Sequence, residues 1–255
     1  MKRSHNYYLV YRILMVLILL TISILIINKN KSFNLVNVFS ASKELPIYSV
    51  KREDKKIALS FDAAYGDEYT LDILDTLDEY DIKSTFFLVK FWVDKFPHQV
   101  VEIHKRGHEI GNHSASHPNM STLSKGDMER EINRTADRIF DLTNERPFLF
   151  RPPYGDYNDL LIQTCRENGY YVIQWDIDSL DWKNLGVQPV VDTVVRNVDS
   201  GSIVLFHNNA DYISEYLPIV IERLLEKGFE IVPVSELIYY DNFQMDNSGR
   251  QIPIE

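Results

Sequence analysis

Short apolar segments alternate with amphipathic segments of helical length through most of the chain, and this alternation limits the fold more than any other feature. The apolar segments are rich in β-branched and aromatic residues, and several amphipathic segments begin at proline or end before glycine. The predicted strands are 57–61, 84–89, 109–111, 148–150, 171–175, 202–206 and 230–232. The predicted helices are 69–80, 97–106, 125–143, 158–168, 188–198 and 215–227. This order predicts an α/β fold with parallel strands and crossover helices, either a doubly wound sheet or a barrel.

Polar and charged residues follow five of the predicted strands. Active sites of parallel α/β folds lie at the C-terminal ends of the strands, so we expect these residues to meet at one rim. Bringing so many charged side chains together raises the cost of desolvating them, so packing alone does not explain their position at one rim. In chain order, the residues are Asp62, His113, His117, Arg151, Asp181 and His207. No glycine-rich phosphate loop follows any strand, which makes a nucleotide-binding sheet less favourable.

His113 and His117 are four residues apart, a spacing that can bring two imidazoles onto one side of a single turn. Pro118 disfavours a continuing helix at His117, which favours a local turn. A metalloprotease helix is excluded because Ser114 stands where that motif has glutamate. The pair suits zinc or another borderline divalent metal, and two hydrogen-bonded loop histidines are the equal alternative.

Nucleophilic serine or cysteine chemistry has no support in this sequence. There is no Gly-x-Ser-x-Gly elbow, and Cys165, the single cysteine, has no histidine beside it. Cys165 lies in a helical pattern and is predicted to be a small buried apolar residue. The histidines on or beside the helix 97–106 are predicted to be solvated: His98, His104 and His108.

Taken together, these segments resemble the five motifs of the polysaccharide deacetylases, which are carbohydrate esterase family four and carry the NodB homology domain. The matching segments are Ser-Phe-Asp at 60–62, His-Ser-Ala-Ser-His at 113–117, Arg-Pro-Pro-Tyr-Gly at 151–155, Asp-Trp at 181–182 and Leu-Phe-His at 205–207. They stand in the order of the family, and the resemblance runs from about residue 51 to residue 240. It implies a distorted (β/α) barrel with seven or eight parallel strands, which agrees with the alternation above.

The resemblance implies a metal-assisted attack by water. Asp62 would be the general base that deprotonates a metal-bound water, and Arg151 would hold Asp62 ionised and oriented. His113 and His117 would bind the divalent metal, expected to be zinc. An activated water of this kind is one requirement of amide hydrolysis.

The resemblance also implies how the transition state and the leaving group are handled. His207 would protonate the leaving amine, with Asp181 sustaining its positive charge. The backbone N–H of Tyr154 would stabilise the oxyanion, and Trp182 and Leu205 would form a small apolar pocket for the acetyl methyl group. A poor amine leaving group needs such an acid and such an oxyanion donor.

One position departs from the family pattern. The family usually has two consecutive aspartates after the Phe of its first motif, the second being a metal ligand, and this chain has Ala63 there. The segment Asp-Ala-Ala-Tyr-Gly at 62–66 is similar to a subgroup associated with sporulation, the PdaB-like proteins. Losing one of three protein ligands weakens metal binding. Asp67 and Glu68 are the nearest carboxylates that could replace it.

The N-terminal segment and the charge distribution point to a domain outside the cytoplasm. Residues 13–27 form an uncharged apolar run, which predicts an uncleaved signal anchor, with a cleaved signal peptide as the alternative. Residues 1–31 contain five basic residues and no acidic residue, so the remainder of the chain carries 22 basic and 37 acidic residues. A net charge of −15 there repels phosphate backbones, so nucleic acid is not expected as a partner.

The predicted organisation has four parts: a signal anchor at 1–31, a tether at 32–50, a deacetylase domain at 51–240 and a loose polar tail at 241–255. The leading hypothesis is a monomeric extracytoplasmic hydrolase that removes N-acetyl groups from amino sugars of a cell-wall or spore-cortex polysaccharide, either peptidoglycan or a chitin-like polymer. The alternative is a membrane-tethered carbohydrate-binding protein whose catalysis is weak or lost because of Ala63. A hydrolase of another acylated amine is a third hypothesis.

Overall fold

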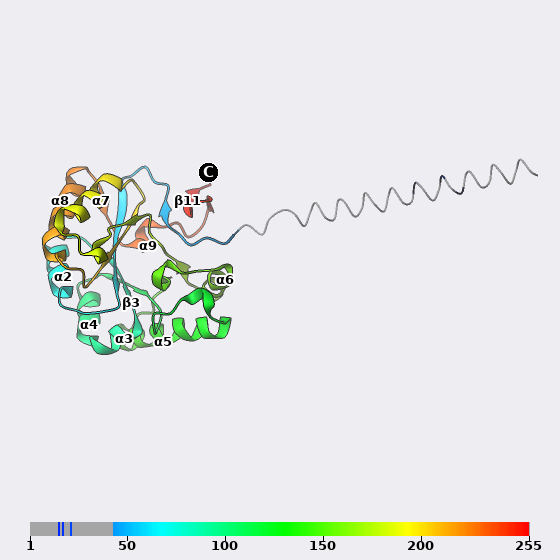
Figure 1. The fold of residues 1–255 in the computed structure, drawn as a ribbon, viewed down its shortest axis with the longest axis horizontal. Helices are drawn as coiled ribbons and strands as arrows, with labels where there is room; N and C mark the ends of the chain where they lie inside the picture. Colours follow the sequence, from blue (N-terminus) through cyan, green and yellow to red (C-terminus); the bar gives the residue numbers. More distant parts are fainter. Residues whose placement is uncertain (1–14, 16, 18–20, 22–42, 255) are drawn as a thin grey trace, which may run out of the picture. The chain divides into compact units, whose positions relative to one another are not determined.

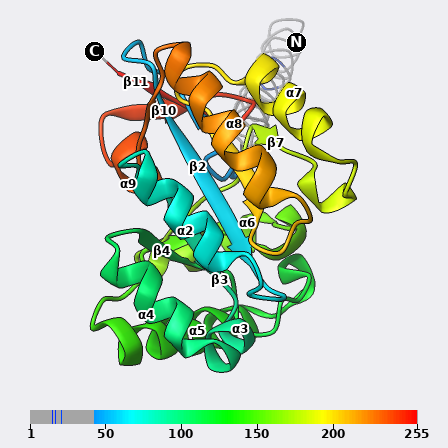
Figure 2. The same cartoon turned by 90° about the vertical axis from the view of Figure 1, so that its left-hand side faces the viewer.

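A long central strand, β2 (Lys56–Ala63), organises the main sheet, and all but its first residue are buried. The computed structural model describes residues 15, 17, 21 and 43–254, and Glu44–Glu255 forms one compact unit. In Figure 2, β2 runs through the middle of this unit behind the helices α2 (Thr70–Glu79) and α8 (Ile213–Glu226). The outward-facing apolar side chains of β2 form the largest core cluster together with these helices.

Within the described residues, the main sheet has eight strands, and every pair in it is parallel. Its order is β6-β5-β4-β3-β2-β8-β7, and β9 pairs with the start of β2. The strands besides β2 are β3 (Thr85–Leu88), β4 (Glu109–Asn112), β5 (Leu149–Phe150), β6 (Tyr171–Val172), β7 (Ile177–Asp178), β8 (Ile203–His207) and β9 (Glu230–Ile231). β6 and β7 are the two ends of this order, so the sheet is open and forms a curled half-barrel. The predicted parallel α/β barrel is confirmed in this distorted form.

Helices connect the strands and cover the sheet (Figure 1). Those not yet given are α3 (Lys90–Lys95), α4 (Pro97–Lys105), α5 (Lys125–Thr143), α6 (Asp159–Glu167), α7 (Val187–Asn197) and α9 (Val234–Leu237). Three short 3₁₀ turns are described as well: η1 (Met120–Thr122), η2 (Pro153–Gly155) and η3 (Asp181–Lys183). The bounds of α5 are those predicted, since Ser124 caps its first turn by accepting a hydrogen bond from the Asp127 N–H.

The two ends of the domain differ from the predicted tether and tail. Residues 241–254 are not a loose tail, because they contain β10 (Phe243–Met245) and β11 (Arg250–Pro253). β11 pairs in parallel with β1 (Ser49–Val50), which lies in the predicted tether, and Val50 is fully buried. A strand two residues long has no periodicity of its own, and this one forms only because distant strands satisfy its backbone.

The N-terminal side of the folded unit also contacts the main sheet. Ile47 forms a bridge with Ile173 beside β6, and Ser49 forms one with Ser202 at the start of β8. The folded domain therefore begins before residue 51. Apart from Met15, Leu17 and Thr21, the predicted anchor at 13–27 lies outside the described residues. Among the described residues, we find no helix long and apolar enough to span a membrane.

Candidate active site

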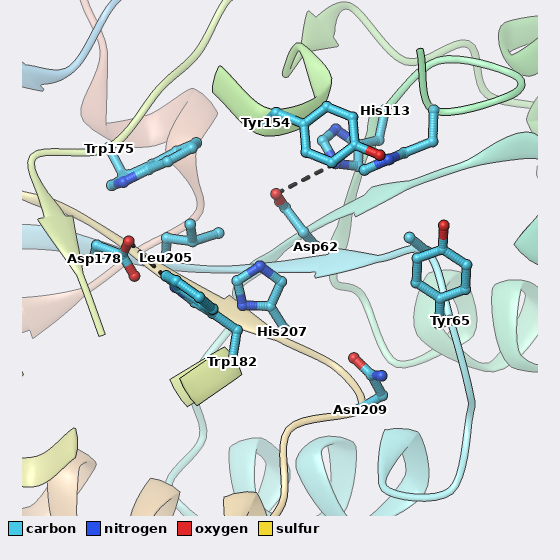
Figure 3. A pocket seen from close by; sticks show the side chains of 12 residues that line it. Asp62, Tyr65, His113, Tyr154, Trp175, Asp178, Trp182, Leu205, His207 and Asn209 are labelled. Carbon is cyan, nitrogen blue, oxygen red and sulfur yellow. Dashed lines mark hydrogen bonds and ion pairs between the residues drawn. The ribbon is translucent and has the colours of Figure 1, made fainter. Parts of the chain in front are cut away.

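The C-terminal ends of β2 and β8 place Asp62 and His207 side by side. The register of the two parallel strands pairs these residues directly. Both line a pocket of about 430 Å³ at this end of the sheet. Figure 3 shows Asp62 near the centre of this pocket, with the His113 ring on one side and the His207 ring on the other. The full lining is Asp62, Ala64, Tyr65, His113, His117, Tyr154, Trp175, Asp178, Trp182, Leu205, His207 and Asn209.

Asp62 is held by a buried arginine. Arg151, which is fully buried, donates from Nη1 to Asp62 Oδ1 at 2.8 Å and from Nη2 to Ser60 Oγ at 2.9 Å. Burial alone raises the pKa of the Asp62 carboxyl, but the charge and hydrogen bond of Arg151, together with the nearby His113 and His207, outweigh burial and hold this pKa below its ordinary value. Asp62 is therefore ionised at neutral pH, as a general base must be.

His207 is held by a buried aspartate. Asp181 Oδ1 lies 2.7 Å from His207 Nδ1, and Asp181 Oδ2 accepts a hydrogen bond from the His207 N–H at 2.8 Å. Burial alone lowers the pKa of His207, but the hydrogen bond and negative charge of Asp181 raise it above its ordinary value. The ring is therefore protonated over a wider pH range than a free histidine, which suits a general acid.

The two histidines of the predicted turn lie together next to Asp62. The His113 and His117 ring centroids are 5.0 Å apart. His113 Nδ1 lies 2.7 Å from the Arg151 carbonyl oxygen and must carry a proton to donate to it, so Nε2 holds the lone pair. Burial lowers the pKa of both rings, that of His117 to about 4, so both are neutral near pH 7.

Aromatic and aliphatic side chains form the rest of the pocket wall. Leu205 is almost fully buried, whereas Trp182 and Tyr154 are 55% and 68% exposed. The Tyr154 ring meets the His117 ring edge-on at 4.5 Å, and Tyr154 has a φ of 59° in the turn η2. The structure thus brings the nine predicted site residues together. Seven of them line the pocket, Arg151 binds Asp62 from behind the pocket wall, and Asp181 binds His207.

A family comparison agrees with this arrangement. The polysaccharide deacetylase model matches residues 49–173. A peptidoglycan-N-acetylglucosamine deacetylase of Bacillus cereus is 37% identical over 198 residues, which cover 76% of this chain and 92% of that protein. The chain belongs to the polysaccharide deacetylase family. The predicted family and enzyme class are therefore confirmed.

Two further members of the family are relevant to the site. The peptidoglycan-N-acetylmuramic acid deacetylase PdaC of Bacillus subtilis is 35% identical, and the match covers 74% of this chain and 40% of PdaC. A crystal structure of a BA3943 mutant, a pseudoenzyme of the same family from Bacillus anthracis with restored enzymatic activity, matches with 34% identity and a TM-score of 0.73. That match covers 75% of this chain and 70% of the other.

The donor atoms in the deacetylase pocket fit a divalent cation, although incompletely. His113 Nε2 directs its lone pair at Asp62 Oδ2, 3.4 Å away, and two electron-pair donors facing each other favour a cation nearby. His117 Nδ1 is buried without a hydrogen-bond partner. Among the described residues, however, no group of three or more His, Cys, Asp or Glu side chains is arranged to hold a metal. The two imidazoles fit the metal, and a third protein ligand is missing.

The two carboxylates that follow Ala63 most closely in sequence, Asp67 and Glu68, are not directed into the pocket. Asp67 Oδ2 accepts a hydrogen bond from Gln99 Nε2 at 3.1 Å, and neither Asp67 nor Glu68 lines the pocket. Ala63 is fully buried in the large apolar cluster. Its carbonyl accepts a hydrogen bond from Val89 N–H at 3.1 Å, close to the turn that carries the histidines.

Five pocket-lining residues were not predicted as site residues although they lie near predicted strand ends: Ala64, Tyr65, Trp175, Asp178 and Asn209. Their proximity to strand ends was the available signal, but no motif singled them out. One prediction for a more distant residue is wrong: His108, expected to be solvated, is 4% exposed. Its Nδ1 accepts a hydrogen bond from the Ser84 N–H at 3.3 Å, and its ring meets Phe86 edge-on at 5.5 Å.

Proposed function

We propose that this chain is a hydrolase that removes N-acetyl groups from amino sugars of a cell-wall polysaccharide. The observation that carries the proposal is the pairing of Asp62 and His207 across one pocket, each held by its own buried partner. A base and an acid in opposite charge states on neighbouring strands are what water attack on an amide and departure of an amine require.

The chain's own residues divide the reaction into two proton transfers. Asp62 takes a proton from the attacking water as its oxygen bonds to the acetyl carbon, and the Tyr154 N–H stabilises the oxyanion. His207 then gives its proton to the sugar nitrogen as the C–N bond breaks, leaving a free amine and acetate. Trp182 and Leu205 enclose the acetyl methyl group.

A divalent metal, for which we propose zinc, would be held by His113 and His117. When bound, it would act as a Lewis acid that lowers the pKa of water and polarises the acetyl carbonyl. His113 is prepared for this role because the Arg151 carbonyl fixes its tautomer. With only two protein ligands, zinc would need water to complete four-coordination, so we expect weak binding.

The substrate class we propose is the peptidoglycan glycan strand. The two relatives compared above are named as deacetylases of peptidoglycan N-acetylglucosamine and N-acetylmuramic acid. Exposed aromatic rings also border the pocket: Tyr65 is 60% exposed and lies 5.7 Å from the Phe91 ring, and Trp182 is exposed as well. Such rings offer apolar faces beyond the acetyl pocket, as binding of several sugar units in a row requires.

A second candidate function is carbohydrate binding without efficient turnover. It is favoured by Ala63 and by the likeness to a pseudoenzyme of the same family. The two functions differ in acetate release. Purified full chain with added zinc is to be incubated with N-acetylglucosamine oligomers of one to six units and with intact peptidoglycan. The hydrolase predicts acetate release that rises with oligomer length, whereas binding with no acetate above background on any substrate would leave only the second function.

We also propose that the domain is held outside the cytoplasm by the apolar run 13–27 acting as an uncleaved anchor. The support is the length of the run, its lack of charge and the absence of small residues suited to cleavage close behind it. Cell fractionation with alkaline extraction tests this: the full-length chain should stay in the membrane fraction. A soluble product that begins near Ala41 would instead show a cleaved signal.

A further inference from the structure

We propose that Tyr216 on α8 is a positioning residue for the acid of the reaction, because its phenol holds Asp181, which in turn holds the His207 ring. This inference rests on the proposed function and assigns a role to a residue outside the five sequence motifs. Tyr216 comes from the helix after β8, whereas Asp181 lies in the turn η3.

The carboxylate of Asp181 is fixed at both oxygens. Oδ1 faces His207 Nδ1 at 2.7 Å. Oδ2 accepts two hydrogen bonds, one from the His207 backbone N–H at 2.8 Å and one from the Tyr216 hydroxyl at 3.0 Å. Asp181 is 1% exposed, so water cannot easily take the place of a missing donor. Rotation of the carboxylate away from His207 would break all three contacts.

Tyr216 itself is suited to be a permanent donor. The side chain is fully buried, and its ring stacks on Phe206, the residue before His207, at 5.9 Å with 19° between the planes. Burial and the nearby Asp181 charge raise the pKa of the phenol above its ordinary value, so it keeps its proton at neutral pH. Packing fixes the ring, and the hydroxyl therefore has one defined acceptor.

Removal of the hydroxyl should affect one chemical step in particular. Without it, Oδ2 keeps a single donor from the backbone, and the carboxylate gains freedom to turn. The His207 ring then loses part of its orientation toward the leaving nitrogen. Protonation of the amine should slow, while binding of the glycan and attack of water, which depend on other residues, should not.

The test compares Tyr216→Phe with Val220→Ala in the full chain at saturating zinc. Val220 lies one turn further along α8, is fully buried and serves as the packing control. Two substrates are used: an N-acetylglucosamine oligomer, whose amine must be protonated to leave, and 4-nitrophenyl acetate, whose phenolate leaves without a proton. We expect Tyr216→Phe to lower kcat for the oligomer about tenfold at unchanged KM, the typical value of one hydrogen bond to a charged group. Hydrolysis of the nitrophenyl ester should stay within about twofold, as a free leaving group demands no acid.

Val220→Ala should lower the melting temperature yet keep both activities per folded molecule. Equal losses on both substrates in Tyr216→Phe, or no loss on the oligomer, would overturn the inference. A wild-type chain that releases no acetate from any oligomer would refute the proposed function instead. In that case, NMR of ¹⁵N-histidine-labelled protein decides the inference: the His207 Nδ1 signal should shift in Tyr216→Phe and not in Val220→Ala, and an unchanged signal would refute it.

Discussion

At the scale of single residues, Arg151 does two separate tasks with two parts of one residue. Its guanidinium binds Asp62 and stacks on Phe87, with the guanidinium carbon 4.0 Å from the ring centroid. Its carbonyl oxygen accepts from His113 Nδ1. A buried cation is tolerated here because its charge is paired and hydrogen-bonded. The proposed base, Asp62, and one proposed metal ligand, His113, are consequently both placed by Arg151.

The opposite charges of Asp62 and His207 predict a bell-shaped dependence of acetate release on pH. Activity requires ionised Asp62, whose pKa lies below its ordinary value, and protonated His207, whose pKa lies above it. His207→Ala should remove the alkaline limb, and Asp62→Asn the acid limb, and each should lower kcat by roughly 10²–10⁴-fold. Rates are to be measured across pH with zinc held constant.

The two variants should differ in stability, which provides an internal control. Asp62→Asn leaves the buried Arg151 without its charge partner and should cost about 3–5 kcal/mol of unfolding free energy. His207→Ala also leaves buried Asp181 without its charge partner, but Asp181 keeps the hydrogen bonds from the residue 207 N–H and the Tyr216 hydroxyl, so the cost should be smaller. Near-normal acetate release by either folded variant would disprove the role assigned to that residue.

Restoring a carboxylate at position 63 should strengthen metal binding. Ala63 lies at the end of β2 beside the histidine turn, since Val89 N–H bonds the Ala63 carbonyl and Lys90 N–H bonds the Ser114 carbonyl at 3.0 Å. We expect Ala63→Asp to tighten zinc binding at least about 10–100-fold, which is the effect of lesser changes around metal sites. Without metal, the added charge lies at an apolar position and should lower the melting temperature.

Titration calorimetry with zinc on wild type, Ala63→Asp and Ala64→Asp measures this effect. Ala64 lines the pocket, so its variant adds the same charge near the site without standing at the family's ligand position. A similar gain in both variants would show a general electrostatic effect and would contradict direct ligation by residue 63.

At the scale of elements, the small sheet β1-β11-β10 joins the two ends of the domain, and Gln251 of β11 fixes it to Tyr239. This side chain is fully buried, and its amide accepts from Tyr239 N–H at 2.8 Å and donates to the Tyr239 carbonyl at 2.7 Å. Both backbone groups of Tyr239 therefore depend on a residue of the predicted loose tail. The C-terminal segment is part of the stable domain.

Gln251→Ala should lower the free energy of unfolding by about 1–3 kcal/mol, because it removes two hydrogen bonds between a buried side chain and the Tyr239 backbone. Gln244, on the exposed side of β10, is the matched control, and Gln244→Ala should change stability by less than about 0.5 kcal/mol. Urea unfolding of the three proteins gives these values. Equal stability of Gln251→Ala and wild type would show that this contact of the C-terminal segment contributes little to the stability of the domain.

How well the sequence predicted each element depended on how local its signal is. The α5 bounds followed from a capping serine and a helical period, and β2 from a run of apolar residues. β1 and β11 are stabilised by each other across the chain, so their own residues show no alternation. The site residues were found because strand ends carried motifs. The contact of Tyr216 with Asp181 was not predicted, because no sequence pattern links one face of a helix to a distant turn.

At the scale of the whole molecule, His108 couples stability to pH. Burial is the main cause that lowers its pKa to about 4, and the positive charge of nearby Lys83 lowers it further. The folded state therefore disfavours the charged ring relative to the unfolded chain, where the pKa is about 6.5. Its contribution to stability is complete above pH 6.5 and is lost as the pH falls toward 4.

Between pH 7 and pH 5, this one residue should remove about 2 kcal/mol of stability. His113 and His117 add to the acid loss, so the comparison must be made with His108→Leu, which keeps them. The variant should be less stable than wild type at pH 7, because Ser84 N–H loses its acceptor, but its stability should fall less steeply with acid. Parallel pH dependences of the two proteins, measured by urea unfolding, would exclude His108 as the source.

The hold of Arg151 on both Asp62 and His113 also has an evolutionary meaning. Asp62 and His113 are both held by Arg151, and these contacts do not involve residue 63, so a change at residue 63 leaves them in place. Alanine and aspartate codons can differ by a single nucleotide. On the proposed ligand set of His113 and His117, a lineage with this scaffold therefore stands one point mutation away from a third ligand, a carboxylate at position 63, without rebuilding its fold.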